Sequence, residues 1–350
     1  MDEPIRDVFQ TLAAGGRLDG DQARRTFDRI MAGELSETVI AALLGAMATR
    51  PAGVDELVGA ATAMRAAMIR VHCDEPCIDT CGTGGDGIST FNVSTTAAII
   101  AASAGATVAK HGNRSTTRAS GSTEALTHLG VDVEARREVV ERSLAEVRIG
   151  YLNAQRLHPA MRFAAPVRRA IPVRTIFNLL GPLVNPAGAR RQLLGVPDAA
   201  LMDPMATALT RLGCDHVWIV HGADGLCDLS VTGSTAVIEV RDGSRRSFAV
   251  EPESVGLNRG SLDDLRVESP RDSANTIRGI LRGDAGAPRD HALLNAGAAL
   301  VVAGLASDLR RGVAMSADAI DDGRAMATLQ AWRAVTGVEG VSDDTTGGKG

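Results

Sequence analysis

The first part of the chain places apolar side chains three and four positions apart, the spacing of helices that bury one face. Val8 and Leu12 follow this spacing, and Phe27 and Ile30 follow it again. The pattern predicts a small all-α N-terminal domain over residues 1–72, with no chemistry of its own.

The same helices carry more apolar residues than one inward-facing stripe of a small domain requires. The surplus includes Leu43, Leu44, Met47, Leu57 and Met64. A surplus of this kind is typical of a subunit interface. We therefore expect a homodimer formed through the helical domain.

After His72 the pattern changes to short apolar segments that alternate with helices. This alternation predicts an α/β domain with a mostly parallel central sheet flanked by helices over residues 73–337. We expect helices from about 158–190 to join the helical domain, and residues 338–350 to form a disordered tail. Strands are predicted at residues 78–79, 107–109, 149–152, 192–196, 217–221 and 237–240.

Composition and charge restrict the cellular setting. The net charge of -5 and the isoelectric point near 5.8 argue against a surface that binds nucleic acid. The longest apolar run, residues 97–109, is too short to span a bilayer, and the acidic N-terminus is unlike a signal peptide. We expect a soluble, cytoplasmic protein with no nucleic-acid or membrane partner.

Five cysteines, an odd number, fit a reduced compartment. Cys73, Cys77 and Cys81 recur every fourth residue, as they would in a metal site. Pro76 and the glycines that follow prevent one helix from bringing the three thiols together. We therefore expect them to be small buried residues.

The segment from Asp79 to Gly130 has the residues of an anion site. Four of its glycines fall within six positions, in the run GTGGDG at residues 82–87. Such a backbone can approach an anion closely and point its N–H groups at phosphate oxygens. Asn92, Ser94 and Thr95 then stand where the next helix begins, so hydroxyl groups and a helix N-terminus face the same place.

A cationic segment and a second hydroxyl-rich turn follow the first loop. Lys110 and Arg114 come at the end of a predicted strand, and Ser120 to Ser122 begin another helix. A lone glycine loop is more often a simple turn. GTGGDG also spells a dinucleotide fingerprint, but its helix starts late and Lys110 replaces the expected acid. The combination indicates a ligand with more than one phosphate group.

Longer motifs carry a resemblance to a known family. GTGGDG, TFNVST, KHGNRS, HPAM, PVR, RTIFNLLGPLVNPA and LLNAGAALVVAG resemble the anthranilate phosphoribosyltransferases, which are nucleoside phosphorylase/phosphoribosyltransferase-like proteins, and the match is collinear from Ile5 to Trp332. The resemblance implies a pentosyltransferase that joins anthranilate to the phosphoribosyl group of phosphoribosyl pyrophosphate and releases pyrophosphate. This reaction is the second step of tryptophan synthesis from chorismate. The resemblance also implies Mg2+ and a homodimer.

The resemblance implies a role for particular residues of this chain. Those matching contacts to phosphoribosyl pyrophosphate are Gly82, Gly85, Asp86, Thr90, Asn92, Val93, Ser94, Thr95, Lys110, His111, Gly112, Asn113, Arg114, Ser115, Thr116, Thr117, Arg118 and Ser122. Those matching contacts to anthranilate are Gly82, Asn113, His158, Arg168 and Gly181. The transition state would be stabilised by Lys110, Ser94 and Asp228, and no general base is required because an aromatic amine is neutral at pH 7.

Some of these residues also have plain structural interpretations. Arg168 could be a solvated charge on a helix surface, His158 could pack a loop, and His111 is expected to be structural. The segment Phe177 to Pro186 resembles a hinge between the helical domain and the sheet.

The chain departs from the family at the proposed metal site and beside it. The relatives have Asp-Glu as magnesium ligands where this chain has Cys227 and Asp228, so the implied metal residues are Ser94, Asp228 and Cys227. A thiol is a poor magnesium ligand because magnesium prefers oxygen. Thr117 and Arg118 stand where the family has two serines.

Two further departures concern the acceptor side and the helical domain. The segment Tyr151 to Gln155 replaces a less polar run, and Asn153 and Gln155 would give a more polar acceptor pocket. This leaves open a related phosphoribosyltransferase or nucleoside phosphorylase with another acceptor. A non-catalytic relative that binds nucleic acid is a third interpretation. The segment Arg50 to Gly53, reading RPAG, is expected to be surface variation.

Overall fold

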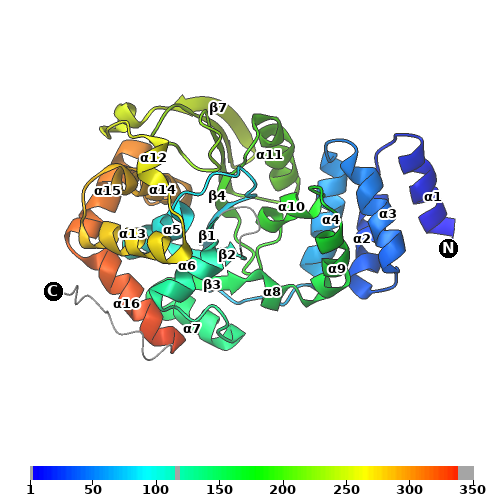
Figure 1. Ribbon diagram of the computed structural model, residues 1–350, viewed down its shortest axis with the longest axis horizontal. Helices are drawn as coiled ribbons and strands as arrows, with labels where there is room; N and C mark the ends of the chain where they lie inside the picture. The colour runs from blue at the N-terminus through cyan, green and yellow to red at the C-terminus, as the bar shows by residue number, and fades with distance from the viewer. Residues whose placement is uncertain (1–2, 115–118, 338–350) are drawn as a thin grey trace.

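A computed structural model describes residues 3–114 and 119–337 (Figure 1). The predicted tail at residues 338–350 and the predicted site residues Ser115, Thr116, Thr117 and Arg118 therefore lie outside the described residues. The α-helices are α1 (Glu3–Ala13), α2 (Gly20–Ala32), α3 (Glu37–Ala48), α4 (Val54–Ala67), α5 (Val93–Ser103), α6 (Ser122–Leu129), α7 (Arg137–Val147), α8 (Ala154–Leu157), α9 (Ala165–Ala170), α10 (Phe177–Leu180), α11 (Met202–Arg211), α12 (Leu262–Leu265), α13 (Pro270–Arg282), α14 (Ala287–Ala303), α15 (Leu309–Asp321) and α16 (Arg324–Thr336). Short 3-10 turns are η1 (Pro159–Phe163), η2 (Gly181–Leu183), η3 (Ala199–Leu201) and η4 (Pro252–Val255).

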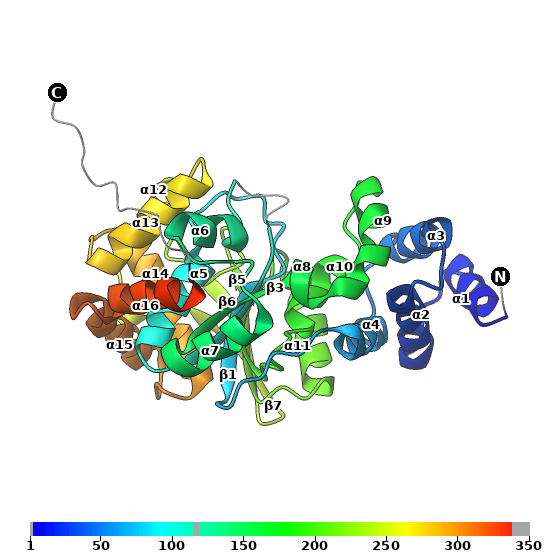
Figure 2. The same cartoon turned by 90° about the horizontal axis from the view of Figure 1, so that it is seen from below.

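Helices α1 to α4 lie together at one end of the molecule (Figures 1 and 2). Asp19 starts α2 with a capping box, Ser36 caps α3 as its position in the sequence suggests, and Gly33 ends α2 with a positive φ of 74°. Helix α9 packs against α3, and α10 packs against α4. We call α1 to α4 with α9 and α10 the helical unit. The domain boundaries drawn from the sequence stay a prediction.

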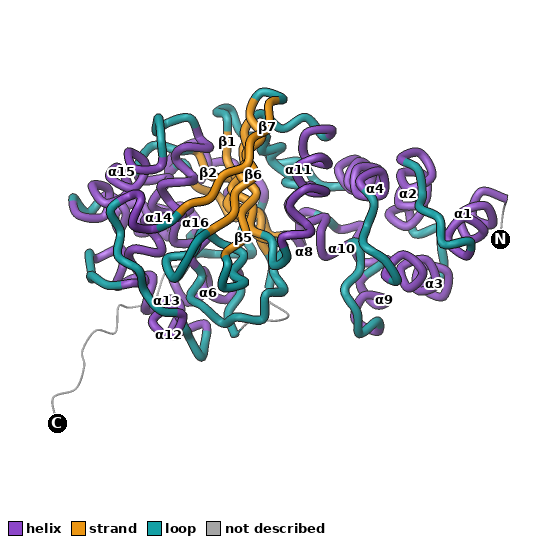
Figure 3. Tube along the Cα trace, turned by 90° about the horizontal axis from the view of Figure 1, so that it is seen from above, coloured by secondary structure: helices purple, strands orange, loops and turns teal. Residues whose placement is uncertain are grey.

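Within the described residues, seven strands form a sheet in the order β3-β2-β1-β4-β5-β6-β7. Figure 3 shows the strands gathered in the middle of the molecule, with helices on both sides. The strands are β1 (Cys77–Gly82), β2 (Thr107–Gly112), β3 (Ile149–Asn153), β4 (Arg191–Gly195), β5 (His216–Gly222), β6 (Thr235–Arg241) and β7 (Ser244–Val250). The first five strands of this order are parallel, whereas β6 and β7 are antiparallel additions at one edge. The predicted class, a helical N-terminal part and a mostly parallel sheet, is confirmed.

The sequence analysis missed β7. Its residues SRRSFAV are mostly exposed, so the strand lacks the apolar run used to find the others. The turn that precedes it does carry a signal. Asp242 and Gly243 both have positive φ values, 49° and 78°, as a two-residue hairpin turn requires.

The sheet divides the apolar core into two large parts. Alternate residues of β5 face opposite sides, as the period of a strand dictates. Trp218 and Val220 pack with α5 and α14 on one face, whereas Val217 and Ile219 belong to a cluster on the other face that also contains Phe27 of α2. The core of the helical unit is therefore continuous with one face of the sheet. We call the sheet and its remaining helices the α/β body.

The cysteines are less buried than the sequence predicts. All five cysteines are free, and Cys77 is buried, but Cys73 and Cys81 are partly exposed, so the expectation of three buried thiols is only partly correct. The part of the chain that the structure describes holds no cluster of three or more His, Cys, Asp or Glu side chains able to bind a metal. None of its helices has the length and hydrophobicity needed to cross a bilayer.

The segment Arg50 to Gly53 is more than surface variation, and the expectation for it is wrong. The Arg50 guanidinium donates to both carboxylate oxygens of Glu56, at 2.9 and 2.7 Å, and Glu56 is fully buried. Leu18 N and Gly53 N also donate to that carboxylate. Burial acts to raise the pKa of Glu56, but these hydrogen bonds hold it below its ordinary value.

Replacing Arg50 with Met should destabilise the protein by about 3 kcal/mol or more, because Glu56 is left as a buried charge without its cation. Arg211→Met is a matched control. Arg211 bonds Asp55 at 2.7 Å, but both side chains are about half exposed, so its loss should cost less than about 1 kcal/mol. Denaturant unfolding measures both. Equal effects of the two changes would contradict the importance given to the buried pair.

Candidate active site

The carboxyl end of β1 opens into the glycine-rich loop. Gly84, Gly85 and Gly87 have φ values of 62°, 89° and 71°, which side chains with a Cβ rarely adopt. A Cβ on Gly85 would overlap the guanidinium of Arg174, and both terminal nitrogens of Arg174 lie 3.2 Å from the Gly84 carbonyl oxygen. The loop therefore has the glycine-dependent backbone conformation that its sequence predicts. The sequence analysis assigned no role to Arg174.

The two predicted hydroxyl-bearing loops lie side by side because Asn92 joins them. Its Oδ1 accepts hydrogen bonds from Ser120 Oγ and Ser273 Oγ, each at 2.7 Å, and its Nδ2 donates to the Ser120 carbonyl at 3.3 Å. The N-termini of α5 and α6 thus meet at one place. Ser94 in the first turn of α5 and Ser122 at the start of α6 border the same cavity.

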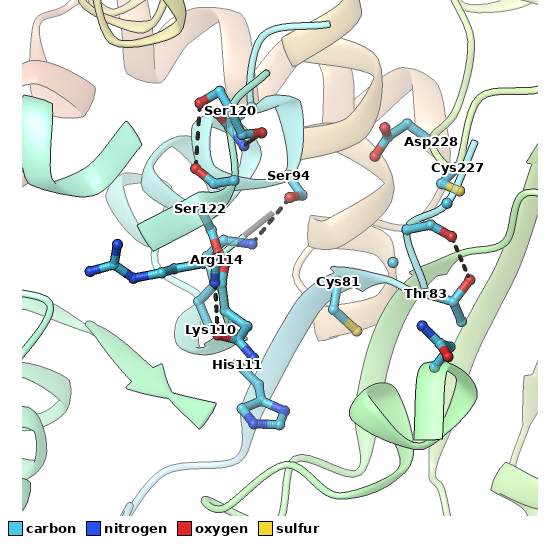
Figure 4. Close-up of a pocket in the computed structure, with 18 of the residues that line it drawn as sticks. Cys81, Thr83, Ser94, Lys110, His111, Arg114, Ser120, Ser122, Cys227 and Asp228 are labelled. Atoms are coloured by element: carbon cyan, nitrogen blue, oxygen red, sulfur yellow. Dashed lines mark hydrogen bonds between the residues drawn. The ribbon is translucent and has the colours of Figure 1, made fainter. Parts of the chain in front are cut away.

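Lys110 reaches this cavity from within the sheet. Its ammonium group donates to the Thr80 carbonyl at 2.7 Å. It also donates to Ser94 Oγ at 3.2 Å (Figure 4). The residue is only 2% exposed, and burial lowers the pKa of Lys110 while the nearby Asp79 carboxylate acts to raise it. The cation is held at the base of the cavity by a buried counter-charge.

The first cavity has a volume of about 250 Å3 (Figure 4). Its lining includes most of the residues predicted to contact a diphosphate: Gly82, Gly85, Asn92, Ser94, Lys110, His111, Gly112, Asn113, Arg114 and Ser122. Thr83, Gly84, Ser120, Gly121, Arg174 and Asn178 also line it.

Asp86, Thr90, Val93 and Thr95 do not line this cavity. Asp86 supports the site from behind, because its carboxylate accepts from Cys227 N at 3.2 Å. The hydroxyl oxygens of Thr90 and Thr95 are buried, and neither has a hydrogen-bond partner among the residues described. Val93 is buried in the core of the α/β body.

Cys227 and Asp228 form the wall opposite Ser120 and Ser122 (Figure 4). Cys227 is 3% exposed and Asp228 is 9% exposed. Asp228 and Ser94 also border a smaller cavity of about 10 Å3, the space of one water molecule. The carboxylate and the hydroxyl group are oxygen donors suited to magnesium, whereas the Cys227 thiol is not. They could hold a magnesium ion only together with oxygens of a ligand.

A second cavity of about 520 Å3 adjoins the first. All five residues predicted to contact an aromatic acceptor border it: Gly82, Asn113, His158, Arg168 and Gly181. The guanidinium of Arg168 lies 5.4 Å from the ring centre of Phe177, which also borders this cavity. The sequence analysis did not assign to this cavity four residues that complete much of its wall: Met64, Met161, Arg162 and Arg169.

The polar residues near this second cavity differ in position. Gln155 borders it and donates to Asn113 Oδ1 at 3.3 Å. Asn153 does not border it, because its amide turns away to the Val133 carbonyl and the Glu134 carboxylate. The expectation that both residues make the pocket polar is correct only for Gln155. Tyr151 hydrogen-bonds Thr123 at 2.7 Å and so supports the start of α6.

His111 and His158 meet at the boundary of the two cavities. His111 Nδ1 lies 3.1 Å from the Gly181 carbonyl oxygen, so Nδ1 carries the proton. The His111 Nε2 atom must then accept from His158 Nε2, which lies 3.2 Å away. Burial lowers the pKa of His111 to about 4 and that of His158 to about 3, so both rings are neutral at pH 7. His111 lines both cavities in addition to its structural contact.

Models of known protein families match both parts of the chain. A model of the glycosyl transferase family, helical bundle domain, matches residues 6–68, and a model of the glycosyl transferase family, a/b domain, matches residues 74–326. The chain has the two domains of that glycosyl transferase family.

Individual relatives show which family of glycosyl transferases the chain belongs to. The chain is 48% identical to anthranilate phosphoribosyltransferase of Maricaulis maris over 330 residues, which cover 94% of this chain and 97% of the relative. The crystal structure of anthranilate phosphoribosyltransferase from Thermus thermophilus matches with a TM-score of 0.89 and 39% identity, over 94% of this chain and 99% of that one. The chain therefore belongs to the anthranilate phosphoribosyltransferase family, and the resemblance seen in the sequence is confirmed.

A more distant structure shares the fold. Anthranilate phosphoribosyltransferase from Saccharomyces cerevisiae, solved in complex with PRPP and Mg, matches with a TM-score of 0.87 at 23% identity, over 96% of this chain and 98% of that one.

The histidine pair predicts a pH dependence of stability. The folded pKa values lie below the ordinary value of 6.5, so the unfolded chain binds protons that the folded chain excludes. The contribution of the two neutral histidines to stability should be fully present above pH ~6.5. The free energy of unfolding should fall as the pH drops toward 4, by up to about 1.4 kcal/mol per pH unit for each histidine. His158→Asn should make this slope shallower in denaturant unfolding measured across the pH range. His72→Asn, at an exposed histidine, is the control and should leave the slope unchanged.

Proposed function

We propose that the protein is an anthranilate phosphoribosyltransferase, which transfers the phosphoribosyl group of phosphoribosyl pyrophosphate to the amine of anthranilate with release of pyrophosphate. One observation carries the proposal: the walls of the two cavities share five residues, Cys81, Gly82, His111, Gly112 and Asn113. An anion-type cavity and a larger, more apolar cavity therefore meet at one boundary. That is where C1 of the ribose and the acceptor nitrogen have to meet.

The donor side supplies groups for the diphosphate. Lys110, Arg114 and the N–H groups at the starts of α5 and α6 bring positive charge to the first cavity. In the reaction the C1–O bond breaks, and its electron pair leaves with the diphosphate. Groups that stabilise this growing charge, Lys110 and Ser94 among them, lower the barrier more than a base would.

The acceptor side supplies a partner for the carboxylate. The planar fork of Arg168 can bind both oxygens of a carboxylate, while Phe177, Met64 and Pro182 provide apolar wall for an aromatic ring. The amine of anthranilate is neutral and attacks C1 with its lone pair. It then releases one proton, which solvent can accept.

Magnesium is the proposed cofactor. Ser94 Oγ and the Asp228 carboxylate are the oxygen donors at the wall of the first cavity, so they would hold the ion together with the diphosphate. When bound, the ion would neutralise charge on the leaving group. Cys227 is not suited to replace a second carboxylate.

The assembly and the location belong to the same proposal. We propose a cytoplasmic homodimer that forms through the helical unit, as the resemblance to the family implies. The apolar residues first taken as a surplus do not support this interface, because all five are buried within the single chain: Leu43, Leu44, Met47, Leu57 and Met64. A monomer found by sedimentation at micromolar concentration would contradict the dimer.

Loss of anthranilate fluorescence on addition of phosphoribosyl pyrophosphate and magnesium tests the activity directly. The proposal expects a loss that requires both additions. A related enzyme with another acceptor is favoured only by the polar contact of Gln155 with Asn113. That enzyme would release pyrophosphate with a different aromatic or heterocyclic amine and leave anthranilate unchanged.

Arg168→Ala should raise the KM for anthranilate by about 30-fold, which corresponds to about 2 kcal/mol for a lost charged contact. Its effect on the KM for phosphoribosyl pyrophosphate should be small, since Arg168 lines the second cavity and not the first. Arg168→Lys should recover little, because an ammonium group cannot bind both oxygens in the same way. An equal rise of both KM values would show that Arg168 does not bind the acceptor.

Asp228→Ala should lower kcat by about 100-fold or more, the usual effect of removing a group that stabilises transition-state charge. Cys227→Asp should lower the magnesium concentration needed for half-maximal rate, because it adds an oxygen ligand. Cys227→Ser is the control for the size of the side chain and should change that concentration little. A full rate in the presence of chelator, or a silent Asp228→Ala change, would contradict the metal site.

A further inference from the structure

Arg174 is a cation of the first cavity that the resemblance leaves without a role. It lies between α9 and α10, which pack on α3 and α4, so it belongs to the helical unit. Its guanidinium nevertheless contacts Gly84 in the loop that follows β1 of the α/β body, at 3.2 Å from each terminal nitrogen. This contact joins residues 90 positions apart that both line the cavity.

The positive charge of Arg174 is not paired with a negative charge in this contact. The carbonyl of Gly84 is neutral, both nitrogens share it, and within the residues described no carboxylate pairs with Arg174. Arg174 is also exposed, so the hydrogen bonds compete with water and hold the side chain weakly. A guanidinium in this setting binds a phosphate group more strongly than a neutral carbonyl, because the phosphate oxygens fit the two donors of the guanidinium and carry negative charge.

The neighbouring loop leaves room for Arg174 and for an anion together. Gly85 has no Cβ, and a Cβ there would displace the guanidinium. Arg174 therefore lies directly against backbone that lines the cavity. An anion bound to that loop would lie within reach of the guanidinium without a large movement of the chain.

We infer that Arg174 binds the diphosphate of the donor substrate from the side of the helical unit. It exchanges the Gly84 carbonyl for a phosphate oxygen and thereby holds the helical unit against the α/β body while the donor is bound. This role rests on the proposed function, since it takes the occupant of the first cavity to be a diphosphate.

Inorganic pyrophosphate with magnesium is the probe, with its binding followed by titration calorimetry. Arg174→Gln should weaken pyrophosphate binding about tenfold, which is about 1.4 kcal/mol, and raise the KM for phosphoribosyl pyrophosphate to a similar extent. The remaining binding should depend less on salt, because one ionic contact is gone. Arg174→Lys keeps the charge and should recover part of the loss. The KM for anthranilate should change less than about twofold.

Arg282→Gln is the matched control, because Arg282 is an exposed arginine that borders neither cavity. It should leave pyrophosphate binding unchanged. The role of Arg174 is overturned if Arg174→Gln binds pyrophosphate as the unchanged protein does, if its salt dependence is the same, or if Arg174→Lys binds no better than Arg174→Gln. Failure of the unchanged protein to bind pyrophosphate would instead overturn the proposed function, and the role of Arg174 with it.

Discussion

A buried carboxylate connects the elements that border both cavities. Asp79 lies within β1 with no exposed surface, and its two oxygens accept from His111 N at 3.1 Å and from Asn185 Nδ2 at 2.8 Å. Asn185 also donates to the Ala109 carbonyl. Burial raises the pKa of Asp79 and lowers that of Lys110, and the attraction between the two charges opposes both shifts. One charged group thus ties β1, the end of β2 and the segment that returns from the helical unit.

The parallel strands bring the loops of the first cavity together, and a glycine at the end of one strand allows close contact between two segments. The carboxyl ends of β1, β2 and β4 lie at the same edge of the sheet, where ligands of open α/β sheets bind. A Cβ on Gly195 would overlap the backbone of Cys227, so the glycine at the end of β4 lets the loop with Asp228 reach the first cavity. The position of Asp228 therefore depends on a residue that touches no ligand.

The sequence predicted the features formed by residues close together in the chain. It missed the contacts formed between distant segments. The six predicted strands each overlap a strand of the sheet, and the two loops of the first cavity were found because their glycines and hydroxyl groups are close together in the chain. Arg174 and Asn178 were not assigned to the first cavity, since they reach it only after the helical unit folds against the sheet. Arg50 was misjudged for the same reason: its partner Glu56 is identified by burial, which a short sequence motif does not reveal.

The electrostatics of the two cavities explain how a neutral nucleophile can be used. Positive charge lies on either side of their boundary, with Lys110 in the first cavity and Arg168 in the second. Between them His111 and His158 are neutral, because burial makes the charged rings costly. An anion at each end can therefore be held without a charge at the reacting centre. In the proposed reaction, a protonated histidine there would repel the positive charge that develops on the ribose carbon, so the low pKa values of the pair would favour the transfer.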